Sequence, residues 1–134
     1  MRFIDTNLFI RYFTRDDEEK AQRVLVLLKR VEKGKERVIT SPLVIFETVF
    51  TLESFYKVPQ KEIKELMLPI LKMKGLRLSN KEIYEQALDI YAAKKNLSFT
   101  DAFNSAFILK KGIKEIYSYD EDFDKIKEIK RITP

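Results

Sequence analysis

Short apolar segments alternate in this chain with longer segments whose apolar residues recur at helical spacing, and this alternation restricts its possible folds most. Predicted strands cover residues 2–5, 37–40, 76–78, 115–119 and 129–133. Between them lie segments with apolar residues three and four positions apart, which is typical of helices packed on one face. Strands that alternate with helices usually pair in parallel. The sequence therefore predicts an α/β protein, a three-layer α/β/α sandwich with a mostly parallel central sheet.

Residues that favour helix ends divide the helical segments. The predicted helix starts are Asn7 (for a helix over residues 8–13), Asp16 or Asp17, Ser41 with Pro42, Pro59, Ser79 with Glu82 in a capping-box pattern, and Ser98 or Thr100. Gly34 and Gly112 mark two of the ends, and Pro69 is expected to kink its helix. No linker rich in Pro, Gly or Ser interrupts the chain. We therefore expect residues 1–134 to form a single domain.

The composition excludes several kinds of catalytic site. The chain has no cysteine and no histidine. Disulfides, thiolate or histidine zinc sites and every Ser-His or Cys-His nucleophile are therefore excluded. Any catalysis must come from carboxylates, Lys, Tyr, hydroxyls or a bound hard cation. The formal net charge of +5 permits a nucleic-acid partner without requiring one.

The hydropathy pattern gives no sign of membrane insertion. No apolar run approaches the roughly 18 residues of a transmembrane helix, and Asp5 interrupts the first apolar stretch, which does not match a signal peptide. We therefore expect a cytoplasmic protein with no membrane contact.

Two acids follow predicted strands. Asp5 ends the first strand, and Asp120 comes just after the strand at residues 115–119, with Asp122 and Asp124 close behind. Ligands of α/β sheets gather at the carboxyl ends of the strands, so these acids are candidates for one site. The alternative is that each acid simply caps the following helix or lies in a polar loop.

Glu47 lies among apolar residues. In the segment SPLVIFETVFTLESF, positions 43, 46, 47, 50 and 54 share one helical stripe, which contains Leu43, Phe46 and Phe50. A carboxylate in a buried stripe is unfavourable unless it is paired or binds a metal. We therefore interpret Glu47 as functional. The alternative is a residue at the edge of the stripe that reaches solvent.

Asp101 lies in the first turn of the helix that begins in SFTDAFNSAFILKKG, where an acid also favours the helix dipole. Together with Asp5, Glu47 and Asp120 it makes four acids in unusual positions. Like charges gather in a fold only with a counter-charge, and Mg²⁺ or Mn²⁺ prefers oxygen ligands. Such an ion can activate water and stabilise charge on a phosphoryl group.

The motifs resemble those of the PIN-domain ribonucleases, and within that family the VapC-type toxins of toxin–antitoxin pairs. The opening MRFIDTN, a Glu in the helix after the second strand, TDAFNSA and SYDEDF follow the family's order over the whole chain. The resemblance implies a parallel sheet and a metal-dependent endoribonuclease that leaves 5′-phosphate and 3′-hydroxyl ends. It implies the following site residues: Asp5, Glu47, Asp101 and Asp120 as catalytic acids; Asp5, Asp101, Asp120 and Asp122 as ligands of Mg²⁺ or Mn²⁺; and Thr6, Asn7 and Ser118 as supporting residues. Asp122 or Asp124 could share the role of Asp120.

The resemblance also implies partners: RNA as substrate and a small antitoxin protein as inhibitor. A homodimer is a further expectation, from the apolar residues named below. Basic residues are expected to grip RNA phosphates. The candidates are Arg11 and Arg15, with Lys110, Lys111, Lys114, Lys125, Lys127, Lys130 and Arg131, although any one of them can be a solvated surface charge. Apolar residues of the helices at 41–73 could form a partner surface or belong to the core: Phe46, Phe50, Leu52, Phe55, Tyr56 and Leu68.

Two other functions fit an acidic, metal-binding α/β domain. A phospho-acceptor receiver domain is one, but it would need an acidic pair at the first strand and a strand-end Lys, which do not stand out here. The other is a PIN-like binding or regulatory module without nuclease activity. Cleavage of RNA with Mn²⁺ and its loss in EDTA would distinguish the nuclease from both.

Overall fold

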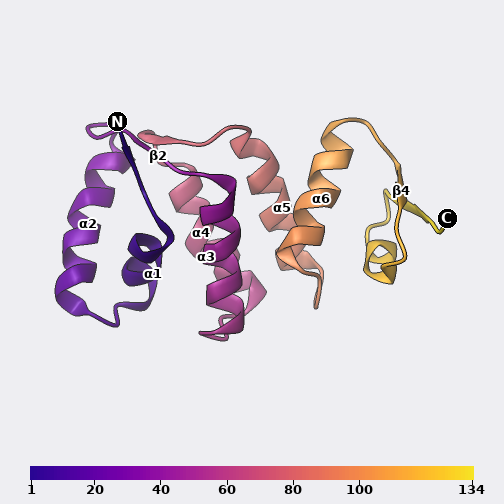
Figure 1. The fold of residues 1–134 in the computed structure, drawn as a ribbon, viewed down its shortest axis with the longest axis horizontal. Coiled ribbons are helices and arrows are strands. Elements are labelled where there is room, and N and C mark those ends of the chain that lie inside the picture. Colours follow the sequence, from indigo (N-terminus) through magenta and orange to yellow (C-terminus); the bar gives the residue numbers. More distant parts are fainter. The chain divides into compact units, whose positions relative to one another are not determined.

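The computed structural model describes residues 1–134, which divide into two compact units, Met1–Ser79 and Asn80–Pro134. The first unit contains β1 (Arg2–Phe3), α1 (Thr6–Thr14), α2 (Glu18–Glu32), β2 (Val38–Ile39), α3 (Pro42–Ser54), α4 (Gln60–Leu71) and β3 (Leu76–Arg77) (Figure 1). The second contains α5 (Lys81–Ala93), α6 (Phe99–Lys110), β4 (Glu115–Tyr117), the 3₁₀ helix η1 (Glu121–Lys125) and β5 (Lys130–Ile132). No helix is both long enough and apolar enough to span a membrane.

The strands of the first unit form a parallel sheet in the order β1-β2-β3. Phe3 pairs with Ile39, and Ile39 pairs with Arg77. The expected buried strand at residues 2–5 is wrong in part, because β1 is one of the two outer strands of this sheet. Phe3 is 57% exposed, and burial begins at Ile4, which is 1% exposed.

A hydrophobic core connects the sheet to the helices of the first unit. Its buried members are Ile4, Phe9, Val24, Leu28, Val31, Val38, Val44, Ile70, Met73 and Leu76. Gly75 fixes a close approach of backbones beside this core. Its N–H donates to the carbonyl of Val31, and its carbonyl accepts from the N–H of Val38, both at 2.8 Å. A Cβ at Gly75 would lie 2.0 Å from the carbonyl oxygen of Glu36, so only glycine fits without a shift of the backbone.

Several predicted helix ends are confirmed. Asp17 caps α2, and Gly34 follows that helix with φ of 77°. Ser41 caps α3 by accepting a hydrogen bond from the N–H of Val44 at 3.3 Å, with Pro42 in the first helical position. Ser98 caps α6. These ends depend on local side-chain-to-backbone bonds or, at Gly34, on a left-handed backbone, which explains why the sequence predicts them.

Two predicted caps are wrong by one or two positions. Asp5, not Asn7, caps α1, because its side chain accepts from the N–H of Thr6 and the helix begins there. Asn80, not Ser79, is the N-cap of α5. Asn80 has left-handed backbone angles (φ 58°) and makes no side-chain capping bond, so the capping box with Glu82 does not form.

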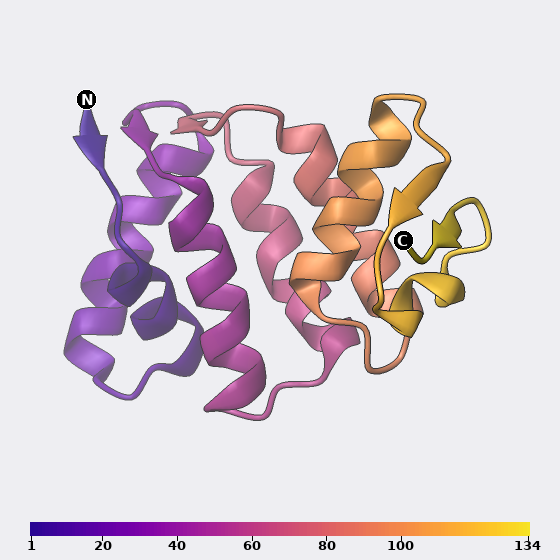
Figure 2. The ribbon, with the colours of Figure 1, turned by 45° about the vertical axis from the view of Figure 1, so that its right-hand side comes forward.

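In the second unit, α5 and α6 lie side by side, and β4 pairs in parallel with β5 (Figure 2). Two pairs of aromatic rings join α5 to α6. The centroids of Tyr84 and Phe103 are 4.9 Å apart, and those of Tyr91 and Phe99 are 5.6 Å apart. Every strand pair in both units is therefore parallel, as the sequence predicts.

Candidate active site

Asp5 lies between β1 and α1, at the carboxyl end of its strand. Its Oδ1 accepts a hydrogen bond from the N–H of Thr6 at 2.7 Å, and its side chain is exposed. The carboxylate therefore caps the helix through one oxygen. An exposed carboxylate has room for a further ligand at its other oxygen, since each oxygen has two lone pairs.

Thr6 connects Asp5 to Glu47 in the first unit. Thr6 is 7% exposed, and its hydroxyl donates to Oε1 of Glu47 at 2.5 Å. One residue thus bonds to two of the predicted acids, from its backbone to Asp5 and from its side chain to Glu47. Asp5, Thr6 and Glu47 form the first carboxylate cluster.

The predicted surroundings of Glu47 are wrong. Leu43 is 78% exposed and Phe50 is 66% exposed, so the stripe that contains Glu47 is the outer face of α3. The buried face of the helix contains Val44, Ile45, Thr48, Val49 and Leu52. Glu47 is exposed as well, as in the alternative of a residue that reaches solvent. Its charge is therefore hydrated and needs no metal to be tolerated.

Asp101, Asp120 and Asp122 form the second carboxylate cluster. One oxygen from each lies within 4.8 Å of the others. Local bonds place all three: the N–H of Asp101 donates to Oγ of Ser98 at 3.0 Å, that of Asp120 donates to Oγ of Ser118 at 2.9 Å, and that of Asp122 donates to Oδ1 of Asp120 at 2.9 Å. The turn of η1 and the start of α6 thus converge on one group of oxygens.

The second cluster is short of positive charge. Burial raises the pKa of Asp101, and the negative charge of Asp120 and a hydrogen bond to Asp120 raise it further. The cation that contacts the cluster is Lys125, whose Nζ lies 2.9 Å from Oδ1 of Asp122. Three crowded carboxylates supply the oxygen ligands that a hard divalent cation prefers, and the single ammonium of Lys125 leaves most of their charge unbalanced.

Asp124 lies outside this cluster. Its two oxygens accept from Nε and Nη2 of Arg131 at 3.1 and 3.2 Å. The sequence leaves open whether Asp120, Asp122 or Asp124 is the fourth acid, and the positions of their oxygens favour the first two. Asp120 and Asp122 join Asp101, while Asp124 is held by an arginine.

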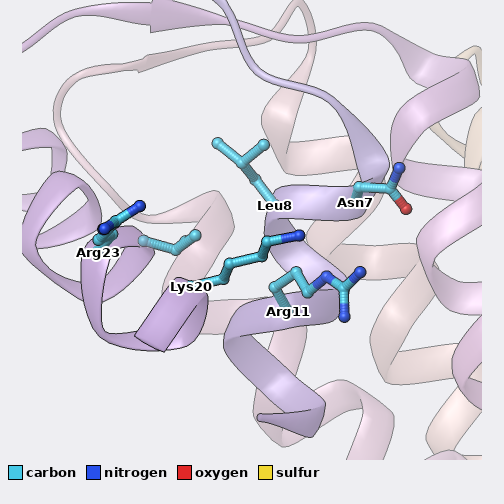
Figure 3. Close-up of a pocket in the computed structure, with 6 residues that line it drawn as sticks. Asn7, Leu8, Arg11, Lys20 and Arg23 are labelled. Carbon is cyan, nitrogen blue, oxygen red and sulfur yellow. The ribbon is translucent and has the colours of Figure 1, made fainter. Parts of the chain in front are cut away.

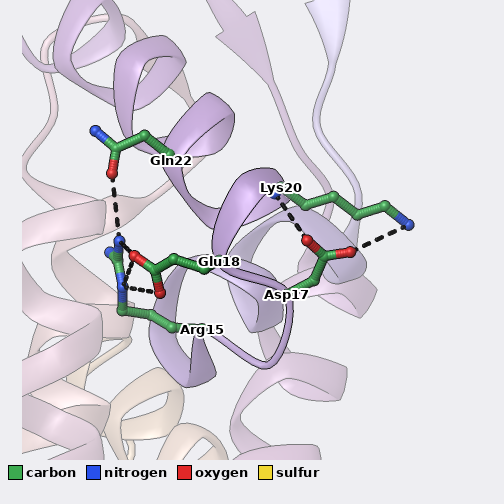
Figure 4. Close-up of polar contacts among 5 residues, drawn as sticks. All are labelled: Arg15, Asp17, Glu18, Lys20 and Gln22. Carbon is green, nitrogen blue, oxygen red and sulfur yellow. Dashed lines mark hydrogen bonds and ion pairs between the residues drawn. The ribbon is translucent and has the colours of Figure 1, made fainter.

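The remaining predicted site residues, Asn7, Arg11 and Arg15, have different surroundings. The amide of Asn7 is exposed, and with Arg11 it lines a pocket between α1 and α2 (Figure 3). The guanidinium of Arg15 bonds to Glu18 and to Gln22 (Figure 4). Arg15 is thus engaged within the protein, whereas Arg11 faces an open pocket.

Two residues that contact the second cluster, Lys125 and Ser98, have a role there that the sequence does not predict. Lys125 was considered as one RNA contact among many, and the structure pairs it with Asp122, three residues earlier in the same turn. The sequence predicts Ser98 as a cap of α6, and the capping bond itself fixes the backbone of Asp101. The signals were the Asp-x-x-Lys spacing and the Ser three residues before Asp101.

Comparison with known proteins defines the class. The sequence model of the PIN domain family matches residues 2–129, and the chain therefore belongs to the PIN domain family. It is also similar to a VapC ribonuclease of Aquifex aeolicus (strain VF5), with 27% identity over 126 residues that cover 94% of this chain and 92% of the relative. The predicted resemblance and the predicted α/β fold class are confirmed.

Proposed function

We propose that this protein is a metal-dependent endoribonuclease that hydrolyses RNA phosphodiester bonds. The observation that carries the proposal is the second carboxylate cluster, in which the oxygens of Asp101, Asp120 and Asp122 lie within 4.8 Å of one another. Membership of the PIN domain family and similarity to a relative named VapC ribonuclease support the ribonuclease activity.

The residues present fit a bound Mg²⁺ or Mn²⁺. Burial raises the pKa of Asp101, and the negative charges of Asp120 and Asp122 raise it further. A divalent cation would relieve the repulsion among these three carboxylates. When bound, such an ion supplies an activated water and stabilises negative charge on the phosphoryl group. Asp101, Asp120 and Asp122 would hold the ion in the second unit.

The other predicted residues would support the acids or contact the substrate. Ser118 orients the backbone of Asp120 by accepting its N–H. Thr6 fixes the carboxylate of Glu47, which would then orient the attacking water by accepting its proton in a hydrogen bond. Asn7 follows Thr6 in the same helical turn and would contact the substrate beside Asp5.

We propose further that the two carboxylate clusters serve one reaction within a single domain. The support is the order of the motifs, which matches the family from the first strand to the last and extends over both units. Asp5, Glu47, Asp101 and Asp120 are then catalytic acids that are each required for cleavage, with Asp122 as an additional metal ligand.

The biological role that fits best is the toxin of a type II toxin–antitoxin pair acting on cytoplasmic RNA. The relative from Aquifex aeolicus supports this role. A small antitoxin would be the inhibitor, and a homodimer is the proposed assembly. Among the apolar residues predicted for a partner surface, Leu52 is in fact in the core at 1% exposure, whereas Phe50 and Phe55 are 66% and 75% exposed and can serve it.

The test is RNA cleavage by the wild-type protein in Mn²⁺, in Mg²⁺ and in EDTA, with analysis of the product ends. We expect cleavage with either metal, none in EDTA, and recovery when Mn²⁺ is restored. The products should carry 5′-phosphate and 3′-hydroxyl groups. Sustained cleavage in excess chelator would show that the metal mechanism is wrong, and a lack of cleavage with either metal would favour a non-catalytic PIN module.

A further inference from the structure

A basic pocket lies between α1 and α2, entirely within the first unit. It encloses about 310 Å³ and is lined by Asn7, Leu8, Arg11, Lys20, Arg23 and Val24 (Figure 3). Three of these side chains are cationic and none is acidic. The volume lies at the lower end of the range for pockets that hold small ligands.

Arg11 is the cation of this pocket with the most capacity for a ligand. It is half-buried, and its guanidinium makes no hydrogen bond or ion pair within the protein. The hydrogen bond that Asp16 accepts from the hydroxyl of Tyr56 at 2.8 Å is the main cause of the lowered pKa of Asp16, and the charge of Arg11 adds only a small further lowering. A partly buried guanidinium with five free donors favours a bound anion, and phosphate matches its planar geometry best.

The other two cations have acidic neighbours outside the pocket. Nζ of Lys20 lies 3.9 Å from Asp17 (Figure 4), and Nη2 of Arg23 lies 2.6 Å from Glu19. Both pairs are on the surface, where such contacts contribute little and rearrange easily. Lys20 and Arg23 therefore add positive potential to the pocket, while Arg11 provides the directed bonds.

The floor of the pocket is apolar. Val24 is 8% exposed and belongs to the core, and Leu8 packs against the same core. An occupant that satisfies the whole lining has a negative group beside Arg11 and a flat or apolar face against Leu8 and Val24. A nucleotide has both, in its phosphate and in its sugar or base.

The position of the pocket on α1 connects it to the first carboxylate cluster. Asp5 caps α1, Thr6 is its first residue, and Arg11 comes six residues after Asp5, roughly 9 Å along the helix axis. We propose that this pocket binds a nucleotide of the RNA strand next to the cleaved bond, with Arg11 on its phosphate and Leu8 and Val24 under its sugar or base. The inference rests on the proposed function and gives that site a substrate-binding residue outside the carboxylates.

The test is binding of a short fluorescein-labelled single-stranded RNA of mixed sequence, measured by anisotropy in EDTA. The proteins are the wild type, Arg11→Gln, Arg11→Lys and the control Lys29→Gln. Lys29 is an exposed residue of α2 outside the pocket, so its substitution removes the same charge from a neighbouring surface. Because the side chain of Arg11 makes no hydrogen bond or ion pair within the protein and its charge acts only weakly on Asp16, the variants should melt close to the wild-type temperature.

We expect Arg11→Gln to weaken RNA binding roughly fivefold to tenfold and to lower the salt dependence by about one phosphate contact. Arg11→Lys should recover part of the RNA affinity, since lysine keeps the positive charge but lacks the paired N–H donors of the planar guanidinium. Lys29→Gln should bind as the wild type does.

Equal losses of RNA affinity in Arg11→Gln and Lys29→Gln would contradict nucleotide binding in the pocket, because they would show that RNA responds only to the overall surface charge. Unchanged RNA binding by Arg11→Gln, together with cleavage by the wild type, would reject the pocket and leave the ribonuclease function intact. Failure of the wild type to bind or cleave RNA would reject both. If Arg11→Gln instead lost binding to an acidic peptide and kept RNA, the pocket would belong to a protein partner.

Discussion

At the scale of single residues, Thr6 is the most informative position, because one hydroxyl links it to Glu47. Thr6→Val keeps the shape of the side chain and the backbone N–H that bonds to Asp5. We expect the variant to lose about 10- to 100-fold in RNA cleavage, as is usual when a residue that orients a catalytic group is removed. The free energy of unfolding should fall by only about 1 kcal/mol, because Glu47 is exposed and remains hydrated.

Thr48→Val is the matched control for this prediction. Thr48 is a buried threonine of α3 whose hydroxyl donates to the carbonyl of Val44 at 2.7 Å, and it belongs to neither carboxylate cluster. Its variant should lose a similar amount of stability and keep full cleavage. Equal cleavage by both variants would mean that the contact between Thr6 and Glu47 is structural.

Asp101 gives a prediction about pH, because burial and Asp120 raise its pKa in the metal-free protein. A raised pKa in the folded state means that folding favours the protonated acid. The stability contributed by this group is therefore fully present below the pKa of the unfolded chain and is lost as the pH rises through the folded pKa. Asp101→Asn is neutral at every pH and avoids this loss.

The measurement is the melting temperature of both proteins in EDTA over a range of pH. Asp101→Asn should melt at or above the wild-type temperature at neutral pH, and the difference should shrink toward acid pH. The variant keeps the backbone bond to Ser98, so the start of α6 is retained. If the variant melted clearly below the wild type at neutral pH, the Asp101 carboxylate would be a structural group.

At the scale of elements, Asp5 shows that capping and chemistry are not alternatives. It caps α1, and Asn caps helices about as well as Asp does. Asp5→Asn should therefore change the free energy of unfolding little, while Asp5→Ala should lower it by about 1 kcal/mol. Both variants should lose nearly all cleavage if Asp5 is a metal ligand. Chemical denaturation with a cleavage assay on each variant gives the answer, and an active Asp5→Asn would remove Asp5 from the site.

The turn between α4 and β3 depends on Gly75. A Cβ there would meet the carbonyl oxygens of Glu36 at 2.0 Å and Val31 at 2.8 Å. Gly75→Ala should lower the free energy of unfolding by about 3 kcal/mol or more, because backbone cannot move aside cheaply. Gly112→Ala is the comparison: it meets nothing within 4 Å but has φ of 76°, so about 1 kcal/mol is expected. Equal losses in denaturant titrations would mean that the contact at Gly75 relaxes.

The sequence predicts elements where the signal is local. Ser41 with Pro42, Ser98 and Gly34 mark helix ends through their own side chains or backbone angles, and the structure has ends at these places. Asn80 is different. It adopts a left-handed conformation without a capping bond, and the sequence pattern favours the neighbouring Ser79 instead.

The orientation of α3 could not be predicted from its pattern. Its apolar residues continue around the helix, from Leu43 through Val44 and Ile45 to Phe46, so periodicity does not choose the buried face. The bond between Thr6 and Glu47 joins residues 41 positions apart and arises only from tertiary packing. The interpretation of Glu47 as functional therefore depends on a buried stripe that the structure does not contain.

At the scale of the whole molecule, the order of the acidic motifs carried the most information. The motif order alone resembles that of the PIN domain family, and the family match extends over residues 2–129. Within the second cluster, SYDEDF places Asp120 and Asp122 two residues apart, whereas the fold brings Asp101 to them. A sequence can therefore name these residues, whereas the grouping of their oxygens comes from packing.

Metal binding should be visible in the stability of the whole chain. An ion that binds only the folded state adds about 2.7 kcal/mol at one hundred times its Kd. Mn²⁺ should therefore raise the melting temperature of the wild type in differential scanning. Asp101→Asn should respond much less, and an equal response from both proteins would place the bound ion elsewhere.

The most direct test of the proposed site compares RNA cleavage by Asp101→Asn and Asp124→Asn in Mn²⁺. Both variants lose one carboxylate of the second unit, but Asp101 belongs to the cluster, whereas Asp124 is held by Arg131. We predict that Asp101→Asn loses nearly all cleavage and that Asp124→Asn cleaves at close to the wild-type rate. Wild-type cleavage by Asp101→Asn, or equal losses in both variants, would contradict a catalytic role for this cluster.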